Sequence, residues 1–406
     1  MELTVICLFA YKDRPYSLHK IVNLFILVFL VIANTIQCVN HSIVSPVYKF
    51  LTEVDYIEFQ LLIFVIVLVY NFIYPIFKFK NISCAIKTPP LLSHEKLILL
   101  SLFSFFMVLF SNRENLPSLF FRGINEVLYI PNESDTNVAG SMLFSSIFRT
   151  MPFACYIMAV NYNIKRKYCR ILLLIMIIDL FPTGISRNQL ATYYLPVLLI
   201  NSKLLQKRNL FVLLMIFGLF VIFPLMNNFR YFMGDDDLVI EYSLDFLDSM
   251  HLDASQEFMI VMKDNMITYG RQLLGVVFFW VPRAIWLTKP EGSGFLLANK
   301  YGVFPNISMP YFAEGYVNFG LIGIFIFTIV LAYISSRFDS IFWDSKNCFL
   351  KKQLTPYYLT ILGGLMLVMR GELMSSTAYM LGSLVDIYMV YVISHKTINK
   401  KSLIIL

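Results

Sequence analysis

Ten runs of mostly apolar residues recur along the chain. Each run predicts a membrane-crossing helix, because about 20 apolar residues span the hydrocarbon core of a bilayer. Several runs are shorter than that, so their helices must extend into flanking residues. The runs cover residues 21–38, 56–77, 97–110, 140–160, 171–182, 190–201, 210–226, 317–335, 357–369 and 378–394.

The overall composition supports the same interpretation. Of the 406 residues, 58% are hydrophobic, and the mean hydropathy is +0.68. Water-soluble globular proteins are only about half apolar. The sequence therefore predicts an all-α polytopic membrane protein with about ten transmembrane helices. The six cysteines show no CxxC spacing, so we expect neither a disulfide framework nor a zinc site.

The basic residues divide the connecting segments into two sides. With the N-terminus inside, 21 of the 33 Lys and Arg residues lie in the segments on one side, and the positive-inside rule makes that side cytoplasmic. Both termini are then cytoplasmic. These segments are residues 12–20, 78–96, 165–170, 203–208, 337–352 and 396–401.

The same rule bears on the apolar run 273–286. If this run crossed the membrane, the basic segment 337–352 would face outward, so we expect a re-entrant or interfacial segment instead. Three parts follow. Residues 1–228 hold about seven transmembrane helices, residues 229–316 form one long periplasmic loop with the re-entrant or interfacial segment, and residues 317–406 hold about three more helices.

Arginine is concentrated away from the cytoplasmic side. The cytoplasmic set has 16 Lys and 5 Arg, whereas the remaining basic residues are 8 Arg and 4 Lys. Lysine suffices to set topology, but the planar guanidinium group suits bidentate binding of phosphate. This bias indicates an anionic ligand at the outer face.

Two arginines are candidates for that ligand: Arg149, about ten residues or roughly 15 Å inside the fourth predicted span, and Arg187, at the outer start of the sixth. Arg149 lies at a depth similar to Asp179 of the next helix, so the two either form a structural ion pair or line an anion pocket. Arg187 enters a helix after Gly184, where free amide groups also favour an anion. Its alternative role is an interfacial arginine whose side chain reaches the headgroups.

The periplasmic loop begins with Arg230 and a series of acidic residues. The triplet Asp235–Asp237 lacks the spacing of a calcium loop, and we expect these acids, including Asp253 and Glu257, to form a solvated face. No metal site is expected. His251 is the only histidine of the loop, and surface polarity explains it as well as catalysis does.

The stretch 269–323 combines charge with aromatic, Gly and Pro residues. Arg271 and Arg283 flank an apolar segment that Pro282 interrupts. Such a segment would enter the membrane surface and hold both arginines among the headgroups; the alternative is a surface segment with lipid-facing arginines. Near the next helix, Glu314 is a candidate general base or an arginine's partner, and Gly320 and Gly323 allow close helix packing.

These residues carry a resemblance. The segments Gly270-Arg-Gln-Leu-Leu-Gly275, Pro282–Pro290 and Pro310–Gly320, together with Arg187 and Arg230, are similar to O-antigen polymerases of the Wzy type, within the O-antigen polymerase and ligase superfamily. The resemblance implies a GT-C-like fold and a metal-independent glycosyltransferase without a cofactor. The enzyme would lie in the bacterial inner membrane with its active site facing the periplasm.

The resemblance also implies partners and roles. Donor and acceptor would be undecaprenyl-pyrophosphate-linked oligosaccharides, beside membrane lipids and a chain-length regulator protein, with no nucleic acid. As a hypothesis, Glu314, Arg283 and Arg271 are the catalytic residues. The residues expected to bind pyrophosphate or glycan are Arg187, Arg230, Arg149, Lys289 and Asn318.

Three other functions stay open. The related O-antigen ligases have a similar fold, although no ligase-like histidine context is evident. A flippase or exporter of lipid-linked glycan would show internal repeats or charge through the membrane depth, and neither is evident. A non-catalytic assembly protein would tolerate neutral substitutions at Arg271, Arg283 and Glu314. Arg370 and Glu372, at the outer end of the ninth run, are expected to form a structural pair.

Overall fold

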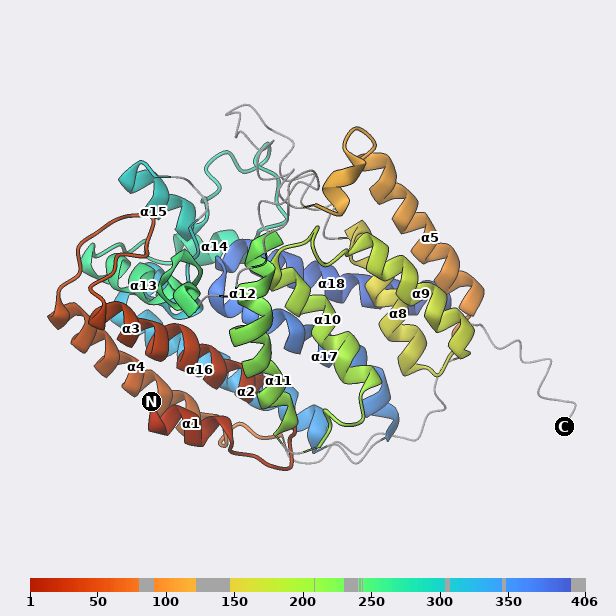
Figure 1. Cartoon of the computed structure of the whole chain (residues 1–406), viewed down its shortest axis with the longest axis horizontal. Helices are drawn as coiled ribbons and strands as arrows, with labels where there is room; N and C mark the ends of the chain where they lie inside the picture. Colours follow the sequence, from red (N-terminus) through yellow and green to blue (C-terminus); the bar gives the residue numbers. More distant parts are fainter. Residues whose placement is uncertain are drawn as a thin grey trace, which may run out of the picture.

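The chain folds entirely into helices in the described part of the computed structural model (Figure 1). An isolated bridge between Leu92 and His395 is the only extended pairing there. This confirms the all-α prediction. The structure describes residues 1–79, 91–121, 147–207, 209–229, 240, 242, 244–303, 307–344 and 348–395.

Each of the ten apolar runs overlaps a helix in the described part of the chain; residues 140–146 of the fourth run lie outside that part. Among the described residues, five helices are long and apolar enough to cross a membrane: Leu18–Val39, α4 (Glu53–Ile73), α5 (His94–Ser111), α16 (Tyr311–Trp343) and α18 (Leu373–Ser394). The first consists of α2 (Leu18–Phe25), a π-helical stretch and α3 (Ala33–Val39). The other runs lie in α8 (Met151–Asn161), α9 (Arg166–Asp179), α10 (Arg187–Asn201), α11 and α12 (Leu210–Phe217 and Phe223–Leu225), and α17 (Cys348–Arg370).

Local sequence signals fix several helix starts. Thr52 and Asp55 form a reciprocal capping box at α4, and Ser186 and Gln189 form one at α10. Each box satisfies backbone N–H groups that have no partner inside the helix. The box at α10 places Arg187 at the first position of that helix, at the external end in the predicted topology.

Two apolar cores hold the helices together. One core joins α2, α3, α4, α11, α13, α16 and α17, and the other joins α5, α8 and α9. Helices α10 and α18 contribute to both: Leu195 and Leu373 belong to the first core, Tyr193 and Ile387 to the second. In Figure 1, α10, α17 and α18 accordingly lie between the two groups.

A buried carboxylate connects the start of α2 to α16. Asp339 of α16 is fully buried and accepts hydrogen bonds from the backbone N–H groups of Leu18 and His19, at 2.9 and 3.2 Å. The hydroxyls of Tyr74 and Tyr358 donate to it at 2.7 Å each. Four donors therefore stabilise one charge that has lost its water.

The segment between α12 and α16 is more than a surface loop. Helix α13 (Ala254–Lys263) is buried from Ala254 to Val261 within the first core. The expectation of a solvated acidic face is therefore wrong for Asp253 and Glu257, which are 4% and 0% exposed. They are four residues apart, so both side chains lie on the same side of the helix. That side faces the core, where polar side chains donate to them. The triplet Asp235–Asp237 lies outside the described residues.

Helix α15 (Ser293–Tyr301) is tied to α13 through Asp264. The Asp264 carboxylate pairs with Lys49, and it accepts from Lys300 and the Tyr301 hydroxyl at 2.7 Å each. Burial acts to raise the pKa of Asp264, but these hydrogen bonds lower it to about 2. This contact fixes the far end of α15 and hence the position of its N-terminus.

We expect Asp339→Ala to destabilise the protein by about 3–5 kcal/mol, because four buried donors lose their common acceptor. The measurement is the denaturation midpoint of the detergent-solubilised protein. The matched control is Asp13→Ala at an exposed position, which should stay within about 0.5 kcal/mol of wild type. Equal stability of both variants would contradict the role of Asp339.

Candidate functional site

A break in α16 organises the candidate site. Phe319 and Gly320 have non-helical backbone angles, and Gly320 lies at φ 64°, ψ −151°, a region open essentially to glycine alone. The chain turns there so that Gly315 and Gly323 approach closely: a Cβ on Gly323 would lie 1.9 Å from the Gly315 carbonyl oxygen. The two predicted packing glycines thus shape α16 itself.

The break frees backbone groups that position α14 (Arg271–Val277). The carbonyls of Val317 and Asn318 accept from the N–H groups of Thr268 and Gly270 at 2.7 and 2.9 Å. The Asn318 side chain accepts from the Leu273 N–H at 2.7 Å and donates to the Glu314 carbonyl. Asn318 is fully buried, so in this arrangement it anchors the start of α14 and its amide does not face the surface.

The apolar run 273–286 forms only this short helix and a series of turns. Seven helical residues span about 10 Å, too little to cross a membrane, in line with the interfacial prediction. Its apolar side chains are strongly exposed; Trp280, Ile285 and Leu287 are 63%, 78% and 84% exposed. An apolar protrusion of this kind fits a lipid environment.

The cations of this protrusion fold back onto its own backbone. Arg271 and Arg283 are exposed and donate to the carbonyls of Thr288 and Lys289, at 3.3 and 3.0 Å. Lys289 donates to the carbonyls of Phe279 and Val281. Burial and the nearby Arg283 charge lower the pKa of Lys289. The structure therefore brings three of the candidate residues together, and we call them the α14 cation group.

Glu314, the candidate base, accepts a hydrogen bond on each of its carboxylate oxygens. One oxygen accepts from the Ser293 hydroxyl at 2.7 Å, and the other from the backbone N–H of Leu373 at 3.0 Å. The side chain is 1% exposed. Glu314 thus joins the N-termini of α15, α16 and α18, and its hydrogen-bond partners are these groups, not an arginine.

Arg187 forms a second candidate group on the N-terminus of α10. Its guanidinium stacks over Phe223 at 4.1 Å and donates to the Phe223 carbonyl. It also contacts His251, 2.9 Å from Nδ1 and 3.2 Å from Nε2. An arginine can only donate, so a ring nitrogen of His251 accepts in this arrangement. The structure thus pairs His251 with a candidate ligand-binding residue.

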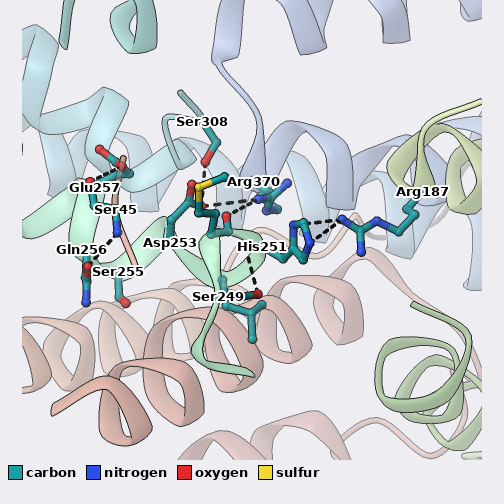
Figure 2. Close-up of polar contacts among 12 residues, drawn as sticks. Ser45, Arg187, Ser249, His251, Asp253, Ser255, Gln256, Glu257, Ser308 and Arg370 are labelled. Atoms are coloured by element: carbon teal, nitrogen blue, oxygen red, sulfur yellow. Dashed lines mark hydrogen bonds and ion pairs between the residues drawn. The ribbon is translucent and has the colours of Figure 1, made fainter. Parts of the chain in front are cut away.

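Arg370 reaches the same segment from the end of α17. Its Nη2 lies 3.5 Å from the Met250 carbonyl and 3.4 Å from Asp253, so the expected pair with Glu372 is replaced by a pair with Asp253. Figure 2 shows Arg187 reaching His251 and Arg370 reaching Asp253. Asp253 is the N-cap residue of α13, and the packing of that helix brings its carboxyl to Arg370. We call Arg187, His251 and Arg370 the His251 group.

Two neighbouring buried carboxyls, those of Asp253 and Glu257, lie beside the His251 group. Burial raises the pKa of Asp253 against the opposing effect of Arg370, and Ser308 donates to it at 3.0 Å. Burial and the Asp253 charge raise the pKa of Glu257 well above its ordinary value, although Ser45 donates to it at 2.7 Å. Asp253 therefore holds Arg370 in place, and Glu257 lies behind it as a second buried carboxyl.

Two further candidates stand apart from both groups. Arg149 Nε donates to the Asp179 backbone carbonyl at 3.2 Å, whereas the buried Asp179 carboxylate oxygens have no hydrogen-bond partner among the described residues. The predicted neighbours are thus confirmed as neighbours, but their contact involves the backbone. Arg230 lies outside the described residues. Within the described part, no three His, Cys, Asp or Glu side chains come together to hold a metal ion.

Sequence reasoning missed Arg370 and Asp253 as members of this site and left His251 undecided. One feature of the sequence could have indicated Arg370 as a site residue: it is one of the eight arginines outside the cytoplasmic segments. Nothing in the sequence showed that α13 would be buried and would carry Asp253 to the end of α17. That contact depends on packing between helices more than 100 residues apart in the chain.

Comparisons of the chain with family models, curated proteins and solved structures find no match to any of them. What the fold defines is a class: an all-helical protein, in its described part, with five helices long and apolar enough to cross a membrane. At the helix ends that the predicted topology places outside, it carries two groups of cationic side chains.

We expect Gly320→Ala to lower stability by about 1–3 kcal/mol, because alanine is strained in this backbone region. The matched control is Gly302→Ala. Gly302 also has a positive φ, of 63°, but it lies in the ordinary left-handed region with open space around it, so the cost should be about 1 kcal/mol. Thermal unfolding in detergent distinguishes the two, and an equal loss would contradict the special role of Gly320.

Proposed function

We propose that the chain is an O-antigen polymerase. In this proposal it is a glycosyltransferase of the bacterial inner membrane with a GT-C-like fold, ten crossing helices and both termini in the cytoplasm. It joins undecaprenyl-pyrophosphate-linked oligosaccharide repeat units at the periplasmic face. The sequence resemblance suggests this activity, and the arrangement of the outer charges supports it.

The single observation that carries the proposal is the convergence of Arg187 and Arg370 on the segment from Met250 to Asp253. The two guanidinium groups come from helices α10 and α17, and both are half-buried. Guanidinium groups held by neighbouring side chains are preorganised for a phosphate, since less conformational entropy is lost on binding. A pyrophosphate in contact with this segment would meet both arginines.

The exposed protrusion after α14 suits the lipid part of such a substrate. Its exposed apolar side chains would contact the polyprenyl chain, and its cationic side chains would contact the charged head. Helix α14 packs against α16 and α18, and Leu321 and Ile322 of α16 are 56% and 71% exposed beside the break. The protrusion thus continues the apolar surface of a candidate membrane helix.

The chemistry follows from these positions. The acceptor hydroxyl attacks the anomeric carbon of the donor, and undecaprenyl pyrophosphate leaves. Negative charge grows on the leaving phosphate, so fixed guanidinium groups there lower the barrier, and one such donor is typically worth ~10²–10³ in rate. Arg187 and Arg370 would contact the pyrophosphate, and Arg271, Arg283 and Lys289 would contact the lipid-linked head at the membrane surface.

A ligase is the second candidate function. The contact between His251 and Arg187 is the observation that favours it, because it supplies the histidine context that the sequence alone did not show. A ligase would transfer the finished glycan to lipid A-core instead of extending the chain on its lipid carrier. The two functions give different products when the gene is lost.

The test is a lipopolysaccharide gel of a strain lacking the gene, complemented with wild type or variants. We expect deletion to reduce the ladder to core plus one repeat unit. Arg187→Lys should fail to restore long chains, with ~10²–10³ lower rate, because lysine cannot bind phosphate in a bidentate manner. Arg283→Lys tests the α14 cation group in the same way.

The matched control is Arg113→Lys, at an exposed position beside Phe110 away from both groups; it should restore the full ladder. Loss of even the single capped unit on deletion would favour the ligase or an export function. A full ladder with Arg187→Lys would exclude bidentate phosphate binding at that residue.

A further inference from the structure

A second carboxyl, that of Glu372, lies beside the buried Glu314. Glu372 is the N-cap residue of α18, and the Leu373 N–H that follows it donates to Glu314. The Glu372 carboxyl lies against Gly292 at the start of α15: a Cβ on Gly292 would be 1.6 Å from its Oε1. Only a residue without a side chain leaves room for this carboxyl.

The two carboxyls differ in what the protein has already bound to them. Glu314 is buried and accepts from Ser293 and Leu373, so its oxygens are screened from a substrate hydroxyl. Glu372 is partly exposed, and no hydrogen bond to its carboxylate is found from the described residues. A general base needs an oxygen that the substrate can reach, and Glu372 offers one.

Glu372 is close along the chain, directly or through its contact Gly292, to residues of both cationic groups. It follows Arg370 of the His251 group by two residues. Its contact Gly292 follows Lys289 of the α14 cation group by three residues, and Arg283 donates to the Lys289 carbonyl at 3.0 Å. A substrate whose pyrophosphate meets the arginines would therefore have its reacting sugar close to this carboxyl.

We infer that Glu372, rather than Glu314, is the general base of the proposed glycosyl transfer. This inference rests on the proposed function. The acceptor hydroxyl gives its proton to a Glu372 oxygen while its oxygen bonds to the anomeric carbon. The bond between that carbon and the pyrophosphate oxygen breaks, and the electron pair leaves on undecaprenyl pyrophosphate. Glu314 is a positioning residue, and its charge adjusts the basicity of its neighbour.

The charges around Glu372 set its titration. Burial and the Glu314 charge raise the pKa of Glu372 to about 7. The cationic side chains on the neighbouring segments contact groups other than Glu372. Arg370 contacts Asp253, Arg271 donates to the Thr288 carbonyl, and Lys289 donates to carbonyls of its own loop. Glu291, next to Gly292, is a further acidic side chain of the same loop. A carboxyl of this kind exchanges its proton near neutral pH.

The experiment measures polymerisation of undecaprenyl-pyrophosphate-linked repeat units by the purified full-length protein as a function of pH. The wild-type rate should rise with pH through about 7, as Glu372 loses its proton. Glu372→Gln should lower the rate by ~10²–10⁴ and remove this rise. A near-normal rate with an unchanged pH profile would overturn the inference.

Glu314→Gln is a second test. Removing the neighbouring charge should lower the pKa of Glu372 and so move the acid limb of the profile to lower pH. If Glu372 had only a structural role, the acid limb of the Glu314→Gln profile would stay at the wild-type pH. That result would overturn the inference even if Glu372→Gln failed to accumulate.

Gly292→Ala should also lower the rate. Adding Glu372→Asp to the Gly292→Ala variant should restore part of the rate, because the shorter side chain avoids the new methyl group.

These outcomes separate the inference from the proposed function. If deletion of the gene leaves a full lipopolysaccharide ladder, the polymerase proposal fails and the base has no reaction to serve. If deletion collapses the ladder but Glu372→Gln polymerises normally, only the assignment of the base fails.

Discussion

The break in α16 at Gly320 is the constraint on which the candidate site depends. A straight helix would keep the Val317 and Asn318 carbonyls within its own ladder of hydrogen bonds. The break releases them to Thr268 and Gly270, and it directs Asn318 to the start of α14. The residues before the break then place Glu314 where α15 and α18 begin. One glycine conformation thereby positions three helix starts.

The buried carboxylates of this protein fall into two kinds. Asp339 and Glu314 accept from donors on both oxygens, because an unpaired charge in an apolar interior is costly, and they hold helices together. Glu372 lies at a partly exposed helix start without such donors. The number of hydrogen-bond donors on a buried carboxylate therefore distinguishes a structural role from the proposed chemical role. The position of the residue in the sequence does not make this distinction.

Much of the helical layout follows from patterns that are local in sequence. The ten apolar runs predicted where helices form. The distribution of basic residues predicted that residues 273–286 do not cross the membrane, and the structure has only the short helix α14 there. The number of membrane crossings stays a prediction, since five helices among the described residues have the required length and apolar character. The acidic residues of the loop were misjudged, because a polar helix such as α13 can be buried when other segments supply Ser45, Ser308 and Arg370 as partners.

The sequence by itself determined that this chain is helical and apolar, and it marked Arg187, Arg271, Arg283, Lys289 and Glu314 as unusual charges. Such information is local, since hydrophobic periodicity, caps and charge bias depend on residues close together in the chain. Only the tertiary structure decided that Arg370 meets Asp253, that His251 meets Arg187, and that Glu372 lies against Gly292. Those contacts join distant segments, and they depend on how whole helices pack, which no short stretch of sequence encodes.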